Sequence, residues 1–175
     1  MEHVAATPSM ASPSSGVAVF EATQVLPGPP SEVFPFFADA FNLEAITPPW
    51  LGFKVLTAPP IEMGLGTLID YRLRWRVLPI RWRTRIAEWD PPHRFVDEQL
   101  RGPYRRWHHT HRFEPHPDGT LMTDRVEYLA PFAFMSHPLV VRRDVERIFA
   151  YRRNRLETLL GAQAASTIGQ AAPPR

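Results

Sequence analysis

Cysteine is absent from the 175 residues of the chain. This absence excludes disulfide frameworks, thiolate metal sites and cysteine nucleophiles. No stretch reaches the roughly 18 consecutive apolar residues that a membrane-spanning helix needs. The N-terminus also lacks the basic region followed by an apolar run that marks a secretory signal. We therefore expect a cytoplasmic protein with no integral membrane association.

Lysine is almost absent as well, because Lys54 is the only one in the chain. Together with 20 prolines, this use of arginine is typical of a GC-rich bacterial genome. The 20 basic side chains face 18 acidic ones, which leaves a net charge of only +2. Such a small excess is weak support for a nucleic-acid partner, and none is predicted.

The length and the hydrophobic content of 44% suit one domain with a packed core. Residues 1–16 are rich in serine, proline and alanine and show no apolar period, which predicts a disordered tail. Residues 161–175 have a similar composition and the same prediction. The folded domain is therefore expected over residues 17–160.

Most of this domain alternates between apolar and polar residues, as a half-buried β-strand does. Residues 67–77 are the clearest case, because Ile69, Tyr71, Leu73 and Trp75 fall on one face and charged residues on the other. A charged face means that the sheet is wet on one side only. The predicted strands cover residues 17–26, 51–57, 67–77, 80–89, 93–100, 104–114 and 120–130.

Helices are expected at two places. Ser31 is a plausible N-cap for a short helix after the first strand, and a second short helix is expected from Asp39 to Ile46. Near the end of the chain the apolar period changes to about 3.6 residues, which predicts a helix over residues 139–160. Gly161 follows as its expected C′ residue. The opposite side of this helix is filled by Arg142, Arg143, Glu146, Arg147, Arg153 and Arg155.

These elements predict an α+β fold: a curved antiparallel sheet of about seven strands, two short helices after the first strand, and a long C-terminal helix. The dry face of a sheet needs a cover, and only the last helix is long enough to cross it. The space between a bent sheet and one helix is the natural place for a small-molecule site.

Several short motifs fit one known superfamily. They are Pro49-Trp50-Leu51-Gly52-Phe53, Gly66 with Ile69 and Tyr71, Trp82 to Ile86, Trp89-Asp90-Pro91-Pro92, Phe95 to Gln99, Gly102-Pro103-Tyr104, Trp107 with His109, His111 and Phe113, and Asp124 to Tyr128. In this order the chain resembles the START-like or SRPBCC superfamily, which includes birch-pollen-allergen-like, lipid-transfer and polyketide cyclase/dehydrase-like proteins.

The resemblance covers residues 17–160 and implies the helix-grip fold and the binding of a hydrophobic ligand. It carries over no set of catalytic residues, because only some members of the superfamily catalyse a reaction. More narrowly, the chain looks like bacterial members that are also found fused to sugar-epimerase-like domains.

The sharpest local feature is a pair of histidines on one predicted strand. His109 and His111 share the apolar face of that strand with Trp107 and Phe113. Matching the apolar faces of this strand and the next places Asp124 on the same wall, with His111 close to directly opposite.

Three interpretations of His109, His111 and Asp124 compete. They form a structural network that satisfies a buried carboxylate, a polar anchor inside an apolar ligand cavity, or a general acid–base group of an enzyme. A metal site is the weakest interpretation, because two histidines need a third ligand and the sequence names none. Neither a metal nor a cofactor is predicted.

Further ligand-binding candidates are the aromatic residues on the expected inner faces and two polar residues. The aromatic candidates combine apolar area with polar tips, and they are Tyr71, Trp75, Trp82, Trp107, Tyr128 and, from the long helix, Phe149. Asp97 and Gln99 are the polar candidates. Their facing stays open, because the turn at residues 101–103 can close in either register.

Arginines alternate with these aromatic residues along residues 72–85, so the rings are expected to point inward and the charges outward. This arrangement favours a solvated basic face over an RNA-stacking platform. Gly64 and Gly66 lack the third glycine of a phosphate-binding loop, and Ser136 lacks the setting of a nucleophile elbow.

The leading functional hypothesis is therefore the binding of a lipid-like, polyketide-like or aromatic small molecule between sheet and helix. One alternative is a cyclase, dehydratase or hydrolase that uses the His/Asp group. The other is an accessory domain that regulates a sugar-nucleotide-modifying enzyme, which only the resemblance suggests. The protein partner is not predicted.

Overall fold

The computed structural model describes residues 17–129 and 138–169. The elements are β1 (Ala18–Leu26), α1 (Pro30–Ala38), α2 (Asn42–Ile46), the 3-10 helix η1 (Pro49–Leu51), β2 (Lys54–Val55), β3 (Leu68–Trp75), β4 (Leu78–Asp90), β5 (Arg94–Arg101), β6 (Arg106–His116), β7 (Gly119–Leu129) and α3 (Pro138–Gly169). This order confirms the predicted α+β helix-grip architecture, with two short helices after the first strand and one long helix at the end.

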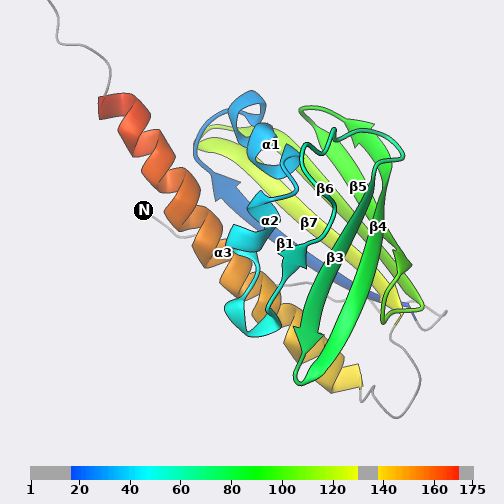
Figure 1. Cartoon of the computed structure of the whole chain (residues 1–175). Helices are drawn as coiled ribbons and strands as arrows, with labels where there is room; N and C mark the ends of the chain where they lie inside the picture. The colour runs from blue at the N-terminus through cyan, green and yellow to red at the C-terminus, as the bar shows by residue number, and fades with distance from the viewer. Residues whose placement is uncertain (1–16, 130–137, 170–175) are drawn as a thin grey trace, which may run out of the picture.

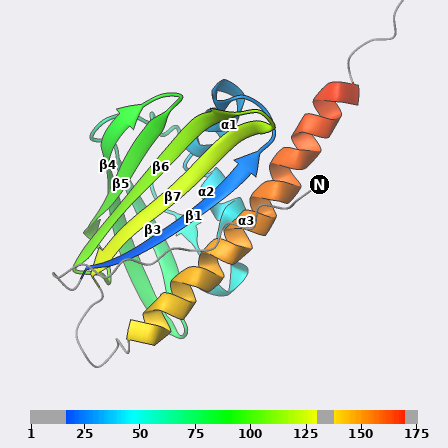
Figure 2. The same cartoon turned by 180° about the vertical axis from the view of Figure 1, so that it is seen from behind.

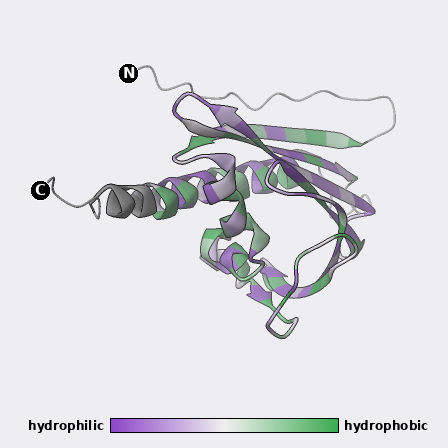
Figure 3. Ribbon diagram, turned by 90° about the horizontal axis from the view of Figure 1, so that it is seen from above, coloured by the Kyte–Doolittle hydropathy of each residue, from purple (hydrophilic) through white to green (hydrophobic). Residues whose placement is uncertain are grey.

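The seven strands form one antiparallel sheet in the order β1-β7-β6-β5-β4-β3-β2. Figures 1 and 2 show α3 running along the sheet next to β1, with α1 and α2 on the same side of the sheet. Seen from above, the sheet curves around the helices, and hydrophilic and hydrophobic residues follow one another along its strands (Figure 3).

The alternation predicted for the strands is present in the structure. Ile69 and Tyr71 on β3 are buried, whereas Arg72 and Arg74, which follow them on the other face, are exposed. The outer arginines are partly neutralised by neighbours, because Arg83 forms a bidentate ion pair with Asp70, with both N–O distances at 2.8 Å. The aromatic rings of these strands thus face inward and the guanidinium groups face outward.

The core has two main parts. One is centred on Phe113, which is fully buried and packs edge-on or tilted against Phe34 and Phe37 of α1. The other lies where Phe20 of β1 meets Phe149 of α3, with ring centroids 4.7 Å apart. Both parts join the inner face of the sheet to α3, so they hold the helix at a fixed place on the sheet.

The edge of the sheet at β1 is joined to α3 by polar contacts as well. The Gln24 side-chain amide donates to the backbone oxygen of Arg153 at 3.1 Å. The guanidinium of Arg153 donates in return to the backbone oxygen of Thr23 at 3.5 Å. The other edge is formed by β2, which has only two residues.

Some predicted element ends were wrong. Pro29, not Ser31, is the N-cap of α1, because Pro30 already has the backbone angle of a first helical residue and the Pro29 carbonyl accepts from Glu32 and Val33. The side chain of Asp39 accepts from the Phe41 amide at 2.9 Å, and α2 begins only at Asn42. The predicted strand over residues 51–57 is interrupted by Gly52, whose φ of 49° ends η1.

The long helix also continues beyond its predicted end. Gly161 does not take the left-handed backbone of a C′ residue, and α3 runs through it to Gly169. Residues 162–165, directly after Gly161, are alanine and glutamine, which are good helix formers and offset the cost of one glycine. The predicted tail from residue 161 therefore begins inside a helix, while residues 1–16 and 170–175 lie outside the described residues. No helix in the described ranges is both long and apolar enough to cross a membrane.

Gly119 fixes the short connection between β6 and β7. Its φ is +136°, and a Cβ at this position would clash with the backbone oxygen of Leu26 at the end of β1. The neighbouring Thr120 hydroxyl donates to the Gly28 carbonyl at 2.7 Å, which ties the same turn to the start of the β1–α1 loop. The register of β6 and β7 is thus set at a point where only glycine fits.

We expect Gly119→Ala to lower the free energy of unfolding by about 1–3 kcal/mol, because the new methyl group adds backbone strain and a steric clash. Gly64→Ala is the matched control, since a Cβ at Gly64 meets no atom within 4 Å. The control should change the stability by less than about 0.5 kcal/mol. Urea denaturation followed by circular dichroism measures both, and equal effects of the two substitutions would contradict this role of Gly119.

Candidate functional site

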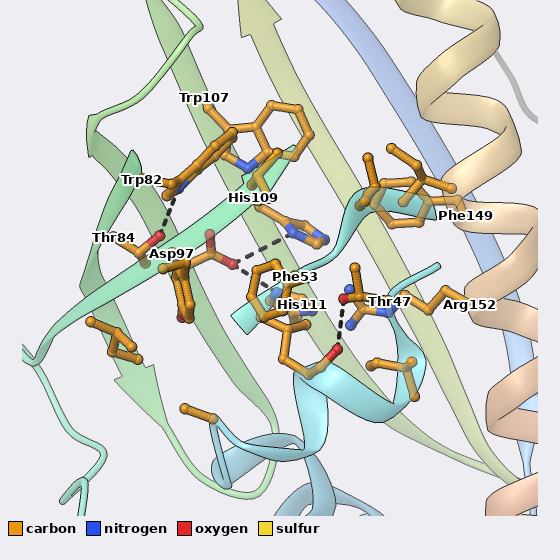
Figure 4. Close-up of a pocket in the computed structure, with 18 of the residues that line it drawn as sticks. Thr47, Phe53, Trp82, Thr84, Asp97, Trp107, His109, His111, Phe149 and Arg152 are labelled. Carbon is orange, nitrogen blue, oxygen red and sulfur yellow. Dashed lines mark hydrogen bonds and ion pairs between the residues drawn. The ribbon is translucent and has the colours of Figure 1, made fainter. Parts of the chain in front are cut away.

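A cavity of about 260 Å³ lies between the inner face of β3–β6, the short helices and α3. Its lining is mostly apolar, and many of the side chains are aromatic (Figure 4). The aromatic lining residues are Phe36, Phe37, Phe53, Tyr71, Trp75, Trp82, Phe95, Tyr104, Trp107 and Phe149. This lining matches the cavity that the bent sheet and the long helix predicted.

The indole N–H groups at the cavity wall already have partners. The Trp82 indole donates to the Thr84 hydroxyl at 3.0 Å, and the Trp75 indole donates to the Asp144 carboxylate of α3 at 2.9 Å. Trp82 also meets Trp107 edge-on, with ring centroids 5.3 Å apart. These rings therefore present apolar surface to the cavity in fixed orientations.

Asp97, His109 and His111 form one polar cluster at this wall. They come from β5 and β6, where Asp97 is paired with His109 across the strands. One oxygen of Asp97, Oδ2, lies 2.9 Å from His111 Nε2 and 3.5 Å from His109 Nδ1. Figure 4 shows both contacts meeting at the Asp97 carboxylate.

Asp124 of β7 lies behind the two imidazole rings, on the side away from Asp97. It is directly opposite His111 in the β6–β7 register, as predicted. Its Oδ1 lies 2.9 Å from His109 Nε2 and 2.8 Å from His111 Nδ1. Each imidazole thus stands between two carboxylates, and the two rings are 3.8 Å apart at their centroids.

Arg152 of α3 completes the cluster. Its side chain is buried, and its Nε lies 3.7 Å from Asp124 Oδ2. The guanidinium also lies 5.8 Å from the ring centroids of both Phe37 and Phe149. The long helix thereby brings a positive charge to the carboxylate that is most deeply placed.

The pKa values of the two carboxylates are shifted in the same direction. Burial by itself works to raise the pKa of Asp124, but the Arg152 charge and the close contacts with His109 and His111 hold it well below its usual range. Burial likewise opposes ionisation of Asp97, and the two histidines outweigh it and lower the pKa of that carboxyl. Both carboxylates are therefore ionised at neutral pH.

The two histidines differ. Burial and the neighbouring His111 lower the pKa of His109, which favours its neutral form. Burial also works against a charged His111, but its contacts with Asp124 and Asp97 prevail and raise its pKa. In neutral His109, Nε2 carries the hydrogen because it faces the ionised Asp124, and Nδ1 keeps a lone pair.

Most of the residues singled out in the sequence lie at the cavity. Those that line it are Tyr71, Trp75, Trp82, Asp97, Trp107, His109, His111 and Phe149. Asp97, whose facing was open, points inward. Asp124 lies in the same cluster behind the rings and does not line the cavity.

Gln99 and Tyr128 are not brought to the cavity. The Gln99 side chain bridges a turn, because it donates to the Tyr104 backbone oxygen at 2.6 Å and accepts from its amide at 3.3 Å. Tyr128 is buried in the part of the core around Phe20 and Val126. Both residues therefore have structural roles here.

Arg152 and Asp144 were not predicted from the sequence. Arg152 follows Val145 and Phe149 and precedes Leu156 at steps of four, three and four residues, which places it on the buried face of α3. That spacing was the available signal. No local pattern marks Asp144, because its partner Trp75 lies 69 residues away in the chain.

The oxygen and nitrogen atoms of the cluster are arranged for more than one kind of chemistry. Asp97, His109 and His111 each offer one ligand atom, and these atoms all lie within 4.8 Å of one another. Asp97 is thus a third residue that could bind a metal ion beside the two histidines, and it could not be identified from the sequence. The same groups can hydrogen-bond a hydroxyl or carbonyl group of a ligand, and neutral His109 can accept a proton.

Among solved structures, the chain is similar to the Zhui aromatase/cyclase from Streptomyces sp. R1128, with 17% identity, a TM-score of 0.66, and coverage of 90% of this chain and 99% of that chain. It is also similar to Ara h 8.0201, with 17% identity, a TM-score of 0.63, and coverage of 84% and 99%. Protein CV1439 from Chromobacterium violaceum gives 17% identity, a TM-score of 0.65, and coverage of 81% and 96%. At these identities the likeness shows a shared fold alone.

No curated protein matches the chain. The family model described as "Polyketide cyclase / dehydrase and lipid transport" matches residues 26–157, which is well over half of the sequence. Together with the helix-grip architecture, this match shows that the chain belongs to the polyketide cyclase/dehydrase and lipid transport family of the START-like superfamily.

Proposed function

We propose that the chain binds a small hydrophobic or amphipathic molecule, lipid-like, polyketide-like or aromatic, in the cavity between the sheet and α3. The observation that carries this proposal is an aromatic-lined cavity of about 260 Å³ with one polar cluster at its wall. Ligand sites of this kind combine apolar area for affinity with a few fixed polar groups for orientation. A cytoplasmic location belongs to the same proposal.

The division between apolar and polar surface supports it. Because the N–H groups of Trp75 and Trp82 are bonded to Asp144 and Thr84, these rings offer a ligand mainly apolar contact. Asp97 is the ionised acceptor of the wall, and its side chain is 19% exposed. We infer that it anchors a hydroxyl group of the ligand.

The family supports the same class of ligand, since its description joins cyclases and dehydrases with lipid transport. Cyclisation, dehydration and lipid transport each begin with the binding of an organic molecule. The proposal therefore does not depend on whether a reaction follows binding.

A variant that fills the cavity tests the location of the ligand. Leu73→Trp adds an indole to the cavity wall, and we expect it to weaken the binding of 1-anilinonaphthalene-8-sulfonate by at least about 10-fold, because apolar contact area is lost. The matched control is Leu68→Trp, on the same strand but facing away from the cavity and 48% exposed. Fluorescence titration measures both, and equal affinities of the two variants would contradict the proposed cavity.

The polar anchor is tested by a pair of probes that differ in one hydroxyl group. Asp97→Asn should weaken the binding of 1-naphthol by about 10-fold or more, since the charged acceptor of the hydroxyl group is replaced by a neutral amide. It should leave the binding of naphthalene nearly unchanged. Isothermal titration calorimetry in a chelating buffer measures both, and an equal loss for the two probes would exclude Asp97 as the anchor.

One observation favours a cyclase or dehydratase as the second candidate. His109 is kept neutral at the cavity wall, with its Nε2–H bonded to Asp124 and its Nδ1 able to accept a proton from carbon. On this alternative, a synthetic linear poly-β-ketone incubated with the chain should become aromatic, as followed by ultraviolet absorbance. His109→Gln should abolish this reaction, and His108→Gln on the outer face of β6 should not; activity that survives in His109→Gln would exclude the mechanism.

A further inference from the structure

The arrangement of lone pairs around Asp97 points to a second kind of occupant for the cluster. His109 Nε2 lies 2.9 Å from Asp124 in hydrogen-bond geometry, and the other ring nitrogen, Nδ1, is directed toward Asp97. Nδ1 and the Asp97 oxygen face each other at 3.5 Å. A cation placed between these two atoms would be bound by both of them.

His111 presents its other nitrogen to the same place. Its Nε2 lies 2.9 Å from the same oxygen of Asp97, and its Nδ1 lies 2.8 Å from Asp124 but outside hydrogen-bond geometry. If Nε2 binds a cation, the hydrogen of the ring is fixed on Nδ1, next to Asp124. A small rotation of the ring then gives the buried Nδ1 the partner that it lacks.

We propose that Asp97, His109 and His111 bind a divalent transition-metal ion such as Zn²⁺, with Asp124 supporting both imidazoles from behind. The nitrogens that face Asp97 Oδ2 are His109 Nδ1 and His111 Nε2, and one ligand atom from each of the three residues lies within 4.8 Å of the others. Bonds of roughly 2.0–2.1 Å to a tetrahedral ion place its ligands about 3.3 Å apart, so the two distances to Asp97, 2.9 and 3.5 Å, need shifts of only a few tenths of an ångström.

The surroundings match those of known metal sites in two respects. A metal-bound histidine usually donates its other ring N–H to a carboxylate, and Asp124 is placed to accept from both rings. The donor set of two imidazoles and one carboxylate favours zinc or iron(II) over calcium and magnesium, which prefer oxygen alone.

The charges of the cluster also admit a dication. Asp97 and Asp124 carry two negative charges, and Arg152 at 3.7 Å from Asp124 supplies one positive charge. A metal ion on His111 takes the place of its proton, so both imidazoles are then neutral and these three groups carry one net negative charge in a largely buried site. A divalent ion offsets it and leaves one positive charge to face the cavity.

The open coordination position would face the ligand cavity, because all three donors line it and Asp124 does not. A metal ion there would polarise a carbonyl oxygen of a bound molecule or lower the pKa of a bound water. This inference goes beyond the proposed binding function and does not depend on it, because metal binding is measured without any organic ligand.

The test uses the full chain, stripped with a chelator and then dialysed. Titration with ZnCl₂ in a calorimeter should show one high-affinity site per chain, and CoCl₂ should give visible absorption bands of a nitrogen- and oxygen-bound ion. Asp97→Ala, His109→Ala and His111→Ala should each weaken Zn²⁺ binding by at least about 100-fold, and Asp124→Asn by about 10–100-fold.

His108→Ala is the matched control, since His108 lies on the same strand with its side chain on the other face of the sheet. It should bind Zn²⁺ as the wild type does. Absence of stoichiometric binding by the wild-type chain would overturn the proposal, and so would unchanged affinity in the three alanine variants.

A second measurement covers variants that do not fold. In the wild-type chain, Co²⁺ should broaden or shift the amide resonances of Asp97, His109 and His111 before any others. Effects confined to the half-buried His116 and the exposed Asp118 would place the ion at the β6–β7 turn instead and would overturn the proposal.

Discussion

Two ionised carboxylates lie beneath the concave face of the sheet, and an unpaired charge in such a place costs several kcal/mol. Asp97 and Asp124 avoid this cost because two imidazoles lie between the two carboxylates. In addition, Arg152 of the long helix lies close to Asp124. The partners come from β5, β6, β7 and α3, elements that are far apart in the chain. The pairing of these charges therefore demands that the whole sheet and the long helix be assembled correctly.

The register of the strands is the means by which this pairing is achieved. His111 stands opposite Asp124 on one side and Phe95 on the other, where the two rings stack with centroids 4.0 Å apart. A slip of one residue between β6 and β7 would turn His111 to the outer face and leave Asp124 buried without it. The tight turn before Gly119 is thus linked to the chemistry at the cavity, although the turn lies at the end of the two strands and His111 and Asp124 lie in their middle.

Much of the fold follows from periodicity that is visible in the sequence. The strict alternation in β3, β4, β6 and β7 identifies the inner face, and for β6 and β7 it also brings His111 opposite Asp124. Short elements were harder to predict, because β2 and α2 depend on Gly52 and on the Asp39 side chain rather than on a repeating pattern. The end of α3 was wrong because a single glycine is a weak stop signal among alanines.

The site was predictable only where a face could be assigned. The face on which Asp97 lies could not be predicted, because the turn after β5 determines it. Gln99, two residues further on, forms a hydrogen bond within that same turn. Predicting the position of Arg152 required the rotational phase of a long helix. Predicting the role of Asp144 required knowledge of the contact between the β3–β4 hairpin and that helix. The geometry of two imidazoles between two carboxylates depends on side-chain orientations that no strand pattern specifies.

The two edges of the sheet have a consequence of a different kind. An exposed strand edge is a template for pairing with another chain, and proteins that leave long edges open are prone to aggregate. Here the β1 edge is joined to α3 through Gln24 and Arg153, and the opposite edge consists of only two residues, Lys54 and Val55. The α3 contacts at one edge and the short strand at the other both disfavour growth of the curved sheet from one molecule to the next.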